Sequence, residues 1–371
     1  MEVLVVNAGS SSLKLRLLDR HDSVIGQHDL VAERGEVDER ALATALAGLP
    51  QPDAVGHRIV HGGARYRDAV RLDDAVVEDL KSLSDLAPLH QLAGLAAHAV
   101  VERVLPGTPA VACFDTAFHA TLPEAAATYA LPREWRQRWP LRRYGFHGLS
   151  HAYAARRAAA LVNRSQHELR VVSCHLGAGA SLCAIGGGRS VDTTMGFTPL
   201  EGLVMATRSG NVDPGLLLWL LEQNRFTPAA VADALEHESG LCGLAGTADR
   251  REVLARVEAG DRDATLALDV YVHRLRAGIA AMAVALDGVD ALVFTGGAGE
   301  HAPALRARTA AGLASLGIVL DAPRNAAATA DADIGAAGAA VRTLVVTARE
   351  DLEIAGQVRA ALHGRTDEEA R

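Results

Sequence analysis

Lysine is almost absent from this sequence. Of the 37 lysine and arginine residues in the 371-residue chain, only Lys14 and Lys81 are lysines. The formal net charge is −8, and no long basic run interrupts the sequence. This charge balance argues against nucleic acid or an anionic membrane as the main partner. We therefore expect small molecules to be the ligands.

Cysteine and long hydrophobic segments are also scarce. The four cysteines are widely spaced, with no C-x-x-C pair, which predicts buried or inert thiols. No segment approaches eighteen uninterrupted apolar residues, and the first residues lack the charged and apolar regions of a signal peptide. The sequence therefore predicts a cytoplasmic protein without a membrane-spanning helix.

Several familiar signatures are missing as well. The chain has no G-x-x-x-x-G-K-[ST] loop, and its glycine runs do not match the dinucleotide fingerprint in context, which disfavours P-loop enzymes and Rossmann dehydrogenases. His147 and His151 have the H-x-x-x-H spacing of zinc sites. Gly148 and the missing acidic partner of an H-E-x-x-H motif argue against zinc.

Apolar strands and helices alternate along the chain, which indicates α/β layers. The length exceeds what one hydrophobic core usually supports, so two domains are expected. The pattern predicts a hairpin over 3–18, helices over 41–48, 74–86, 92–104 and 263–286, and strands over 54–60, 109–114, 170–188, 291–297 and 343–348.

An internal repeat supports two related domains. The stretch "RVVSCHLGAGASLCAIGGG" at 170–188 repeats the opening stretch with an offset of 168 residues, so that Gly9 corresponds to Gly177. A repeat of this length is longer than a solenoid unit. It predicts two similar domains that face each other across a cleft.

Three runs of small residues lie next to predicted strands: 8–12, 177–181 and 295–301. Small side chains let backbone N–H groups approach an anion. Serine hydroxyls in the first run, and Lys14 just after it, strengthen the prediction of a phosphate site. A strand lysine exposed to solvent is the simpler alternative for Lys14.

Cationic and imidazole side chains gather in short motifs. Arg58 and Arg208 could hold an anion from two domains, because a guanidinium binds carboxylate or phosphate in a bidentate manner. A structural salt bridge is the alternative for Arg208. Imidazole could donate a hydrogen bond to a charged transition state. The polar motifs contain His57, His61, His90, Asp115, His119, His147 and His151.

The motifs together resemble the acetate kinase family, within the superfamily of acetate and sugar kinases, Hsp70 and actin. The resemblance covers nearly the whole chain in order, through "NAGSSSLK", "GHRIVHGG", "APLH", "FDTAFH", "YGFHGLSH", "HLGAGAS", "SVDTTMGFTPLEGLVMATRSG" and "FTGGAGE". It implies two duplicated actin-like, ribonuclease H-like domains, with mixed sheets flanked by helices and the active site in the interdomain cleft. It places the N-terminal domain at 1–119 plus 352–371, and the nucleotide-binding, dimerising domain at 120–351.

The resemblance also implies a reaction. ATP and acetate would give acetyl phosphate and ADP reversibly, by direct in-line transfer that depends on Mg²⁺, with Mn²⁺ as a possible replacement, in a cytoplasmic homodimer that serves acetyl-CoA synthesis. Arg58 and Arg208 would hold the carboxylate and the phosphoryl group, and His147 would stabilise the transition state. Asp115 would orient the reacting groups. Asn7 and Glu350 would support the metal.

Further roles follow from the same resemblance. The acetate methyl pocket would be Val60, Leu89, Phe146 and Pro199. The nucleotide and its phosphates would contact Ser10, Ser12, Lys14, His175, Gly177, Ala178, Gly179, Asp249, Arg251, Gly296, Gly297 and Gly299. A pocket sized for one methyl group discriminates weakly against each added methylene, so propionate should react less well and butyrate poorly.

The sequence also departs from the family pattern. Ala178 stands where the family has asparagine, "PLHQLAG" replaces "PLHNPAN", and "TADRRE" replaces the adenosine-side "SSDMRD". These changes keep a propionate kinase, and a family member with another phosphoryl donor, as alternatives. A nucleotide-driven switch of the chaperone or actin kind, and a catalytically silent family member, are two more.

Overall fold

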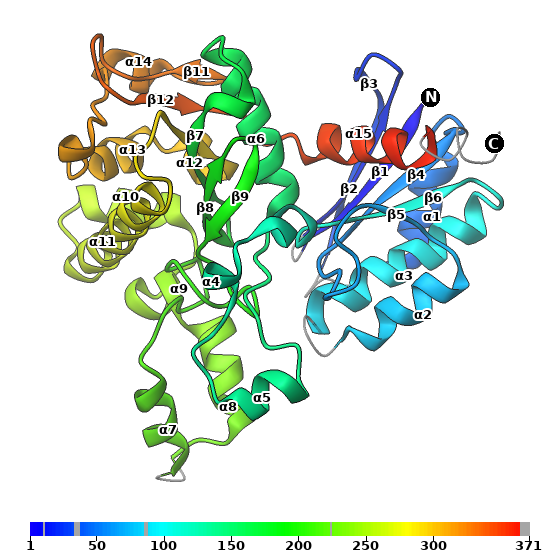
Figure 1. The fold of residues 1–371 in the computed structure, drawn as a ribbon, viewed down its shortest axis with the longest axis horizontal. Helices are drawn as coiled ribbons and strands as arrows, with labels where there is room; N and C mark the ends of the chain where they lie inside the picture. Colours follow the sequence, from blue (N-terminus) through cyan, green and yellow to red (C-terminus); the bar gives the residue numbers. More distant parts are fainter. Residues whose placement is uncertain (10–11, 33–37, 85–87, 223–224, 364–371) are drawn as a thin grey trace. The chain divides into compact units, whose positions relative to one another are not determined.

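The computed structural model describes residues 1–9, 12–32, 38–84, 88–222 and 225–363, and the chain divides into two compact units (Figure 1). Unit 1 comprises Met1–Ala120, Phe146–Tyr153 and Arg349–Arg371. Unit 2 comprises Thr121–Gly145 and Ala154–Ala348. Among the described residues, no helix combines the length and the apolar character that crossing a membrane requires.

Unit 1 is built on a six-stranded mixed sheet with the strand order β3-β2-β1-β4-β6-β5. β1, β4 and β6 are parallel, whereas β2, β3 and β5 pair in the antiparallel direction. The strands are β1 (Val3–Ala8), β2 (Ser12–Leu18), β3 (Val24–Val31), β4 (Ala54–Ile59), β5 (Val70–Arg71) and β6 (Ala110–Phe114).

Helices cover both faces of this sheet (Figure 1). Alternate residues of β1 and β2 pack with α1 (Glu39–Ala47) and α3 (Pro88–Val104) in one core cluster. The opposite face, including Val3 and Val5, packs against α15 (Glu350–His363). The period-two alternation of a strand therefore assigns each side chain to one helical layer. α2 (Asp74–Ser82) lies beside α3.

Unit 2 repeats this topology. Its sheet has the order β11-β12-β10-β7-β8-β9, with β7, β10 and β12 parallel and the other pairs antiparallel. The strands are β7 (Arg170–Leu176), β8 (Ala180–Gly186), β9 (Arg189–Thr193), β10 (Ala291–Thr295), β11 (Ala332–Asp333) and β12 (Arg342–Val345). β1 and β7 hold the same central position, which confirms the repeat that the sequence predicts.

The duplicated hairpins differ in the number of residues that connect their strands. In unit 1 the last paired residues are Ala8 and Leu13, which enclose four residues. In unit 2 they are Leu176 and Ala180, which enclose three. The connection between the paired residues is therefore one residue shorter in unit 2 than in unit 1.

Further helices, joined by loops, lie between and beyond these strands. The longest of the described helices, α11 (Arg262–Ala285), is N-capped by Asp261, whose carboxylate accepts a hydrogen bond from the Ala264 N–H. The other helices are α4 (Glu124–Ala127), α5 (Arg133–Arg138), α6 (Gly148–Leu161), α7 (Pro214–Glu222), α8 (Pro228–Asp233), α9 (Gly240–Ala245), α10 (Arg250–Glu258), α12 (Gly296–His301), α13 (Pro303–Ala310) and α14 (Ala322–Ala327). Short 3-10 turns occur at Ala117–Thr121, Gln166–Glu168 and Ala314–Leu316, and a π-helical turn at Ala234–Glu238.

Most predicted elements are confirmed, with corrections at their ends. The strand predicted over 291–297 ends at Thr295, because Gly296 adopts a φ of 75° and begins α12. The strand predicted over 343–348 ends at Val345. The segment predicted as one strand over 170–188 is the β7–β8 hairpin. The ends of these strands depend on tertiary packing, so apolar periodicity alone does not predict them.

Candidate active site

The parallel strands of unit 1 bring polar side chains to one edge of the sheet. Asn7 lies near the end of β1, Arg58 near the end of β4, and Asp115 directly after β6. The carboxyl ends of parallel strands are the usual ligand-binding edge of α/β sheets. The sequence separates these residues by up to 108 positions (115 minus 7), and the strand order reunites them.

Arg58 is the centre of this cluster. Its Nε donates to Asp115 Oδ1 at 3.0 Å and its Nη2 donates to Asp115 Oδ2 at 2.6 Å, in a bidentate pair. Its Nη1 donates to Asn7 Oδ1 at 3.3 Å and to the Ala8 carbonyl at 3.2 Å. Burial lowers the Arg58 pKa, but the negative charges of Asp115 and Glu350 more than reverse this effect and raise it. The guanidinium is therefore charged and held in a fixed plane.

Glu350 joins the cluster from the other end of the chain. It is the first residue of α15, where the positive end of the helix dipole favours a carboxylate. Its Oε2 accepts a hydrogen bond of 2.7 Å from Asn7 Nδ2. Asn7, Arg58, Asp115 and Glu350 thus form one connected polar network within unit 1.

His147 lies at the N-terminus of α6 in an unusual conformation. Its φ is 56°, a left-handed value that non-glycine residues rarely adopt. The next residue, Gly148, donates its N–H to the Asp115 carbonyl at 2.9 Å. A Cβ at Gly148 would lie 2.2 Å from that carbonyl oxygen, so only glycine fits there. This contact fixes His147 next to the strand end that carries Asp115.

Buried histidines support this region without being charged. His61 and His119 are fully buried, and burial lowers the pKa of each to about 4. His119 Nε2 lies 3.0 Å from the Phe146 carbonyl oxygen. Because a carbonyl oxygen can only accept, Nε2 carries the hydrogen of the neutral ring. These rings are neutral at pH 7. His61 packs against the Phe146 ring, and His119 packs against His151, which in turn packs against His147. The sequence pattern alone did not separate them from His147.

In unit 2, backbone contacts shape the loop that carries Arg208. The Met205 N–H donates to the Arg208 carbonyl, and the Leu241 N–H donates to the Met205 carbonyl. The Arg208 guanidinium makes two long contacts, to the Pro199 carbonyl at 3.4 Å and to Met205 Sδ at 4.0 Å. Burial lowers the Arg208 pKa, and Glu236 opposes that shift only in part.

The small-residue turn of unit 2 is held by its surroundings. The Gly177 N–H donates to the Gly179 carbonyl at 2.9 Å, and the Ala178 carbonyl accepts from the Ala206 N–H at 3.1 Å. Arg250 Nη2 donates to the Gly177 carbonyl at 2.8 Å. Arg250 is thus a contact of this turn that the sequence analysis missed, because its neighbour Arg251 seemed the better match.

Asp249 and Arg251 have local roles in the structure. Asp249 is the N-cap of α10 and accepts from the Arg251 N–H, while the Arg251 side chain is 91% exposed and forms an ion pair with Asp249. Their predicted contact with the nucleotide stays a prediction.

The third small-residue run is the start of α12, and a buried arginine holds that helix. Arg306 is fully buried on α13. Its Nη1 donates to the carbonyls of Gly299 and Glu300, and its Nε and Nη2 donate to Asn325. No local sequence pattern distinguishes Arg306 from the other arginines, so its role was not predicted.

The remaining predicted residues are distributed as follows. Val60 and Phe146 are buried in unit 1, and Pro199 is in unit 2. Ser12 and Lys14 lie on β2, where Lys14 pairs with Asn7 across the hairpin and is exposed. His175 is the penultimate residue of β7, and Gly297 lies in α12. Ser10 and the side chains of Leu89 and His90 lie outside the described residues.

Two mixed sheets with the same strand order, one in each unit, define a duplicated actin-like fold. The model of the Acetokinase family matches residues 49–356. An acetate kinase of Gloeobacter violaceus is 43% identical over 96% of this chain and 98% of its own length. The chain belongs to the Acetokinase family.

Solved structures agree with this assignment. The crystal structure of an acetate kinase from Porphyromonas gingivalis has a TM-score of 0.88 and 34% identity, and covers 97% of this chain and 99% of its own. A propionate kinase from Francisella tularensis has the same TM-score of 0.88 and 32% identity, with coverage of 97% and 99%.

Proposed function

We propose that this chain is an acetate kinase, which transfers a phosphoryl group from ATP to acetate and forms acetyl phosphate and ADP. The observation that carries the proposal is the 43% identity to an acetate kinase over 96% of the chain. The Arg58 network supplies the chemistry that such a transfer needs, because charge spreads over the phosphoryl oxygens and positioned cations must stabilise it.

Arg58 and Arg208 would have different roles in the reaction. Arg58 is oriented by Asp115, so it presents a fixed cation at the strand ends. Arg208 is half-buried, and neither of its two long contacts is to a carboxylate. An anionic ligand would compensate its desolvation. We assign Arg208 to the carboxylate or the phosphoryl group of the substrates.

Acetate needs no strong base to react. Its carboxylate oxygen would attack the terminal phosphorus as the bond to the ADP oxygen breaks, so no proton has to leave the nucleophile. His147 would donate a hydrogen bond to the phosphoryl oxygens during this step. Its left-handed φ of 56° is the kind of backbone strain that proteins retain at functional positions.

The oxygen donors near Arg58 fit a magnesium ion held jointly with a nucleotide. Among the described residues no group of three or more metal-binding side chains comes together. Mg²⁺ in phosphoryl-transfer enzymes is usually bound by one or two protein oxygens, waters and substrate phosphates. Asn7 and Glu350 supply one amide and one carboxylate at such a place. When bound, the ion would neutralise developing charge on the phosphates.

Nucleotide binding is assigned to the second domain, 120–351, through the small-residue turn at Gly177 and the start of α12. Ala178 is exposed and lacks the amide that the family pattern has there. A phosphoryl donor other than ATP is therefore the alternative that this position favours. The donor is best identified by comparing ATP, GTP and pyrophosphate at equal concentration.

The test of the proposal is coupled product formation. Purified protein with Mg-ATP is incubated without acid and with acetate, propionate or butyrate, while ADP is measured and acyl phosphate is trapped as the hydroxamate. We expect both products to rise together with acetate and to fall toward butyrate. ADP release that ignores the added acid would favour a nucleotide-driven switch, and no product with any donor would indicate a silent family member.

A propionate kinase is the second candidate, because the Francisella tularensis structure of that name is as similar in fold as the acetate kinase structure. The two are separated by kcat/KM for propionate relative to acetate. A ratio above one would assign the chain to propionate.

We also infer a cytoplasmic homodimer. α7 has no buried residue, and Leu216, Leu218 and Trp219 are 47%, 57% and 45% exposed. An apolar surface of this kind is typical of a protein interface. Light scattering on wild type and on a Leu218→Glu, Trp219→Glu double variant would test it: a wild-type dimer that becomes a monomer supports this interface.

A further inference from the structure

Two carboxylates of unit 2 accept hydrogen bonds from consecutive backbone amides near the end of the chain. The Thr347 N–H donates to Asp331 Oδ1 at 2.8 Å, and the Ala348 N–H donates to Glu300 Oε1 at 3.0 Å. Residues 346–348 follow β12 and belong to no helix or strand, so side chains rather than a strand partner satisfy these two amides. We call residues 346–348 the anchored segment.

The two carboxylates are themselves held in place. Glu300 lies in α12 and is only 9% exposed. Its backbone carbonyl accepts from Arg306 Nη1 at 2.7 Å, and its second carboxylate oxygen lies 3.9 Å from His301 Nε2. Asp331 forms an ion pair with Arg157 of α6. Hydrogen bonds from a backbone N–H to a carboxylate are among the strong ones, so the anchored segment has two firm attachments within unit 2.

The anchored segment leads directly to a residue that is assigned to the metal. The chain passes from unit 2 to unit 1 after Ala348, and Glu350 follows two residues later. Consecutive Cα atoms are about 3.8 Å apart, so two steps span at most about 7.6 Å. The backbone of Glu350 therefore cannot move far unless the anchored segment moves with it.

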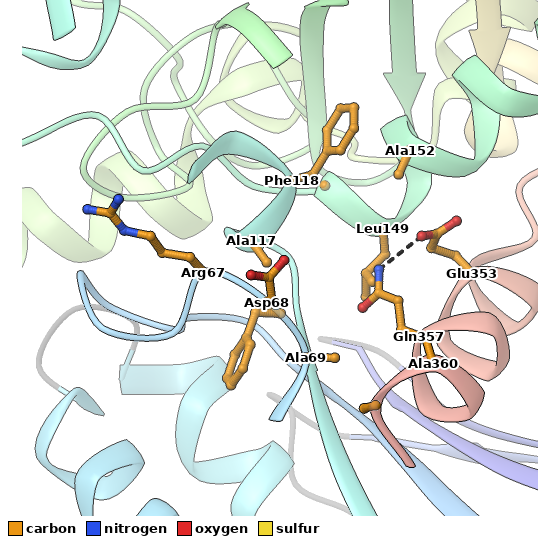
Figure 2. Close-up of a pocket in the computed structure, with 13 residues that line it drawn as sticks. Arg67, Asp68, Ala69, Ala117, Phe118, Leu149, Ala152, Glu353, Gln357 and Ala360 are labelled. Carbon is orange, nitrogen blue, oxygen red and sulfur yellow. Dashed lines mark hydrogen bonds between the residues drawn. The ribbon is translucent and has the colours of Figure 1, made fainter. Parts of the chain in front are cut away.

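Packing does not hold α15 on every side. A cavity of about 330 Å³ adjoins this helix within unit 1. Figure 2 shows Glu353 and Gln357 of α15 on one side of the cavity, and Leu149 and Ala152 of α6 on another. A cavity offers no protein atoms for close contact, so packing fixes this face of the helix less firmly. The position of Glu350 at the start of α15 then depends on the anchored segment as well.

We propose that Glu300 is a positioning residue for Glu350, because its hydrogen bond to the Ala348 N–H sets where the metal-supporting carboxylate begins its helix. α12 also contains Gly296 and Gly297, which are predicted to contact the nucleotide. Glu300 would therefore link the nucleotide site to the metal site. The anchoring half of this proposal stands by itself, whereas the metal half rests on the proposed function.

Hydrogen exchange of the backbone amides of 346–352 in the ligand-free, full-length protein tests the anchoring half. Glu300→Ala removes the acceptor, and we expect the Ala348 amide to exchange about tenfold faster. Glu300→Gln keeps an acceptor oxygen and should exchange like wild type. The control is Asp290→Ala, because Asp290 Oδ2 accepts the Arg170 N–H at 2.9 Å elsewhere in unit 2. Unchanged exchange in Glu300→Ala, or equal acceleration in Asp290→Ala, would overturn the anchoring.

The metal half is tested by binding rather than by turnover. Calorimetry gives the affinity for ADP with Mn²⁺ and without metal, and the ratio of the two affinities measures the metal contribution. In Glu300→Ala we expect this ratio to fall about tenfold, as when a residue that orients a metal ligand is lost. Glu300→Gln should restore it. Asp290→Ala should keep it, although both alanine variants should unfold about 2–4 °C lower than wild type.

Each outcome decides one half of the proposal. A wild-type ratio in Glu300→Ala, or an equal loss in Glu300→Gln or Asp290→Ala, would overturn the role of Glu300 toward the metal. A wild-type protein that binds no ADP would overturn the proposed function and the metal half together. The hydrogen exchange of the anchored segment needs no ligand, so it decides the anchoring half in either case.

Discussion

Asn7 and Glu350, 343 positions apart in the chain, are joined by a hydrogen bond of 2.7 Å between Asn7 Nδ2 and Glu350 Oε2. The bond links the end of the first strand to the start of the last helix. Because Asn7 also accepts from Arg58, the two ends of the chain complete the cluster around that arginine. Proper docking of α15 is therefore a condition for the candidate site, and not only for stability.

Removal of Arg58 should abolish most activity. Arg58→Ala deletes a fixed cation and leaves Asp115, which is 1% exposed, without its ion-pair partner. We expect kcat to fall by about 10²- to 10³-fold and the free energy of unfolding to fall by about 3 kcal/mol. Steady-state kinetics and urea unfolding measure the two effects.

The matched control for Arg58 is Arg103→Ala. Arg103 forms an ion pair with Glu39, but both side chains are more than 60% exposed. Such a surface pair contributes less than about 1 kcal/mol. Near-normal turnover in Arg58→Ala would contradict the proposed role of Arg58 in catalysis. Loss of turnover in Arg58→Ala, with normal turnover in Arg103→Ala, would support it.

Gly148 should act as a positioning residue. Gly148→Ala would place a Cβ 2.2 Å from the Asp115 carbonyl oxygen and 2.8 Å from Phe118 Cβ, so α6 must shift at its start. We expect kcat to fall by about 10²-fold, since displacement of a catalytic group by about 1 Å has an effect of that size. The KM for ATP should change little, because the displaced groups lie in unit 1.

Gly356→Ala on α15 is the control for Gly148. A Cβ at Gly356 meets no atom within 4 Å, and alanine favours a helix by about 0.5–1 kcal/mol. This variant should retain full activity and unfold at a slightly higher temperature. If Gly148→Ala loses stability but keeps its kcat, the positioning role is wrong.

The buried histidines should make the fold sensitive to acid. Burial lowers the pKa of His61 and His119 to about 4, whereas an unfolded chain protonates histidine near pH 6.5. Below pH 6.5 the unfolded state binds more protons than the folded state, so stability falls as the pH falls toward 4. Each residue then accounts for a loss of about 3 kcal/mol.

This pH effect is measured by urea unfolding between pH 7 and 4.5. His119→Gln should reduce the slope of the unfolding free energy by about 1.4 kcal/mol per pH unit below pH 6. His273→Gln is the control, because His273 is exposed on α11 as it is in the unfolded chain. Equal slopes for wild type and His119→Gln would show that His119 is protonated in the folded protein.

Restoring an amide at position 178 should strengthen nucleotide binding. Ala178 is exposed, and its carbonyl is engaged by the Ala206 N–H, so a larger side chain can be added without breaking the turn. For Ala178→Asn we expect the KM for ATP to fall about five- to tenfold, the size of one hydrogen bond. Ala178→Leu adds similar bulk without a donor. Equal KM values for ATP in the two variants would show that position 178 does not contact the nucleotide phosphates.

Sequence patterns indicated which residues are candidates for the site, but not which side chains contact one another there. Arg58, Asp115 and His147 stand in distinctive motifs, so local sequence was enough to select them as candidates. Arg250 and Arg306 have no such motif, and their contacts with Gly177, Gly299 and Glu300 arise from helices that are distant in sequence from the turns they hold. Local pattern carries no information on such pairs.

By itself, the sequence determined the duplicated architecture, because strand periodicity and the offset of 168 residues are properties of neighbouring residues and of their repetition. Only the tertiary structure decided that Arg58 pairs with Asp115 in a bidentate manner, that Glu350 reaches Asn7, and that Glu353 lies in the wall of a cavity. These facts depend on strand order and helix docking, which bring together atoms separated by tens to hundreds of residues. Long-range packing sets such distances, and no local pattern specifies them.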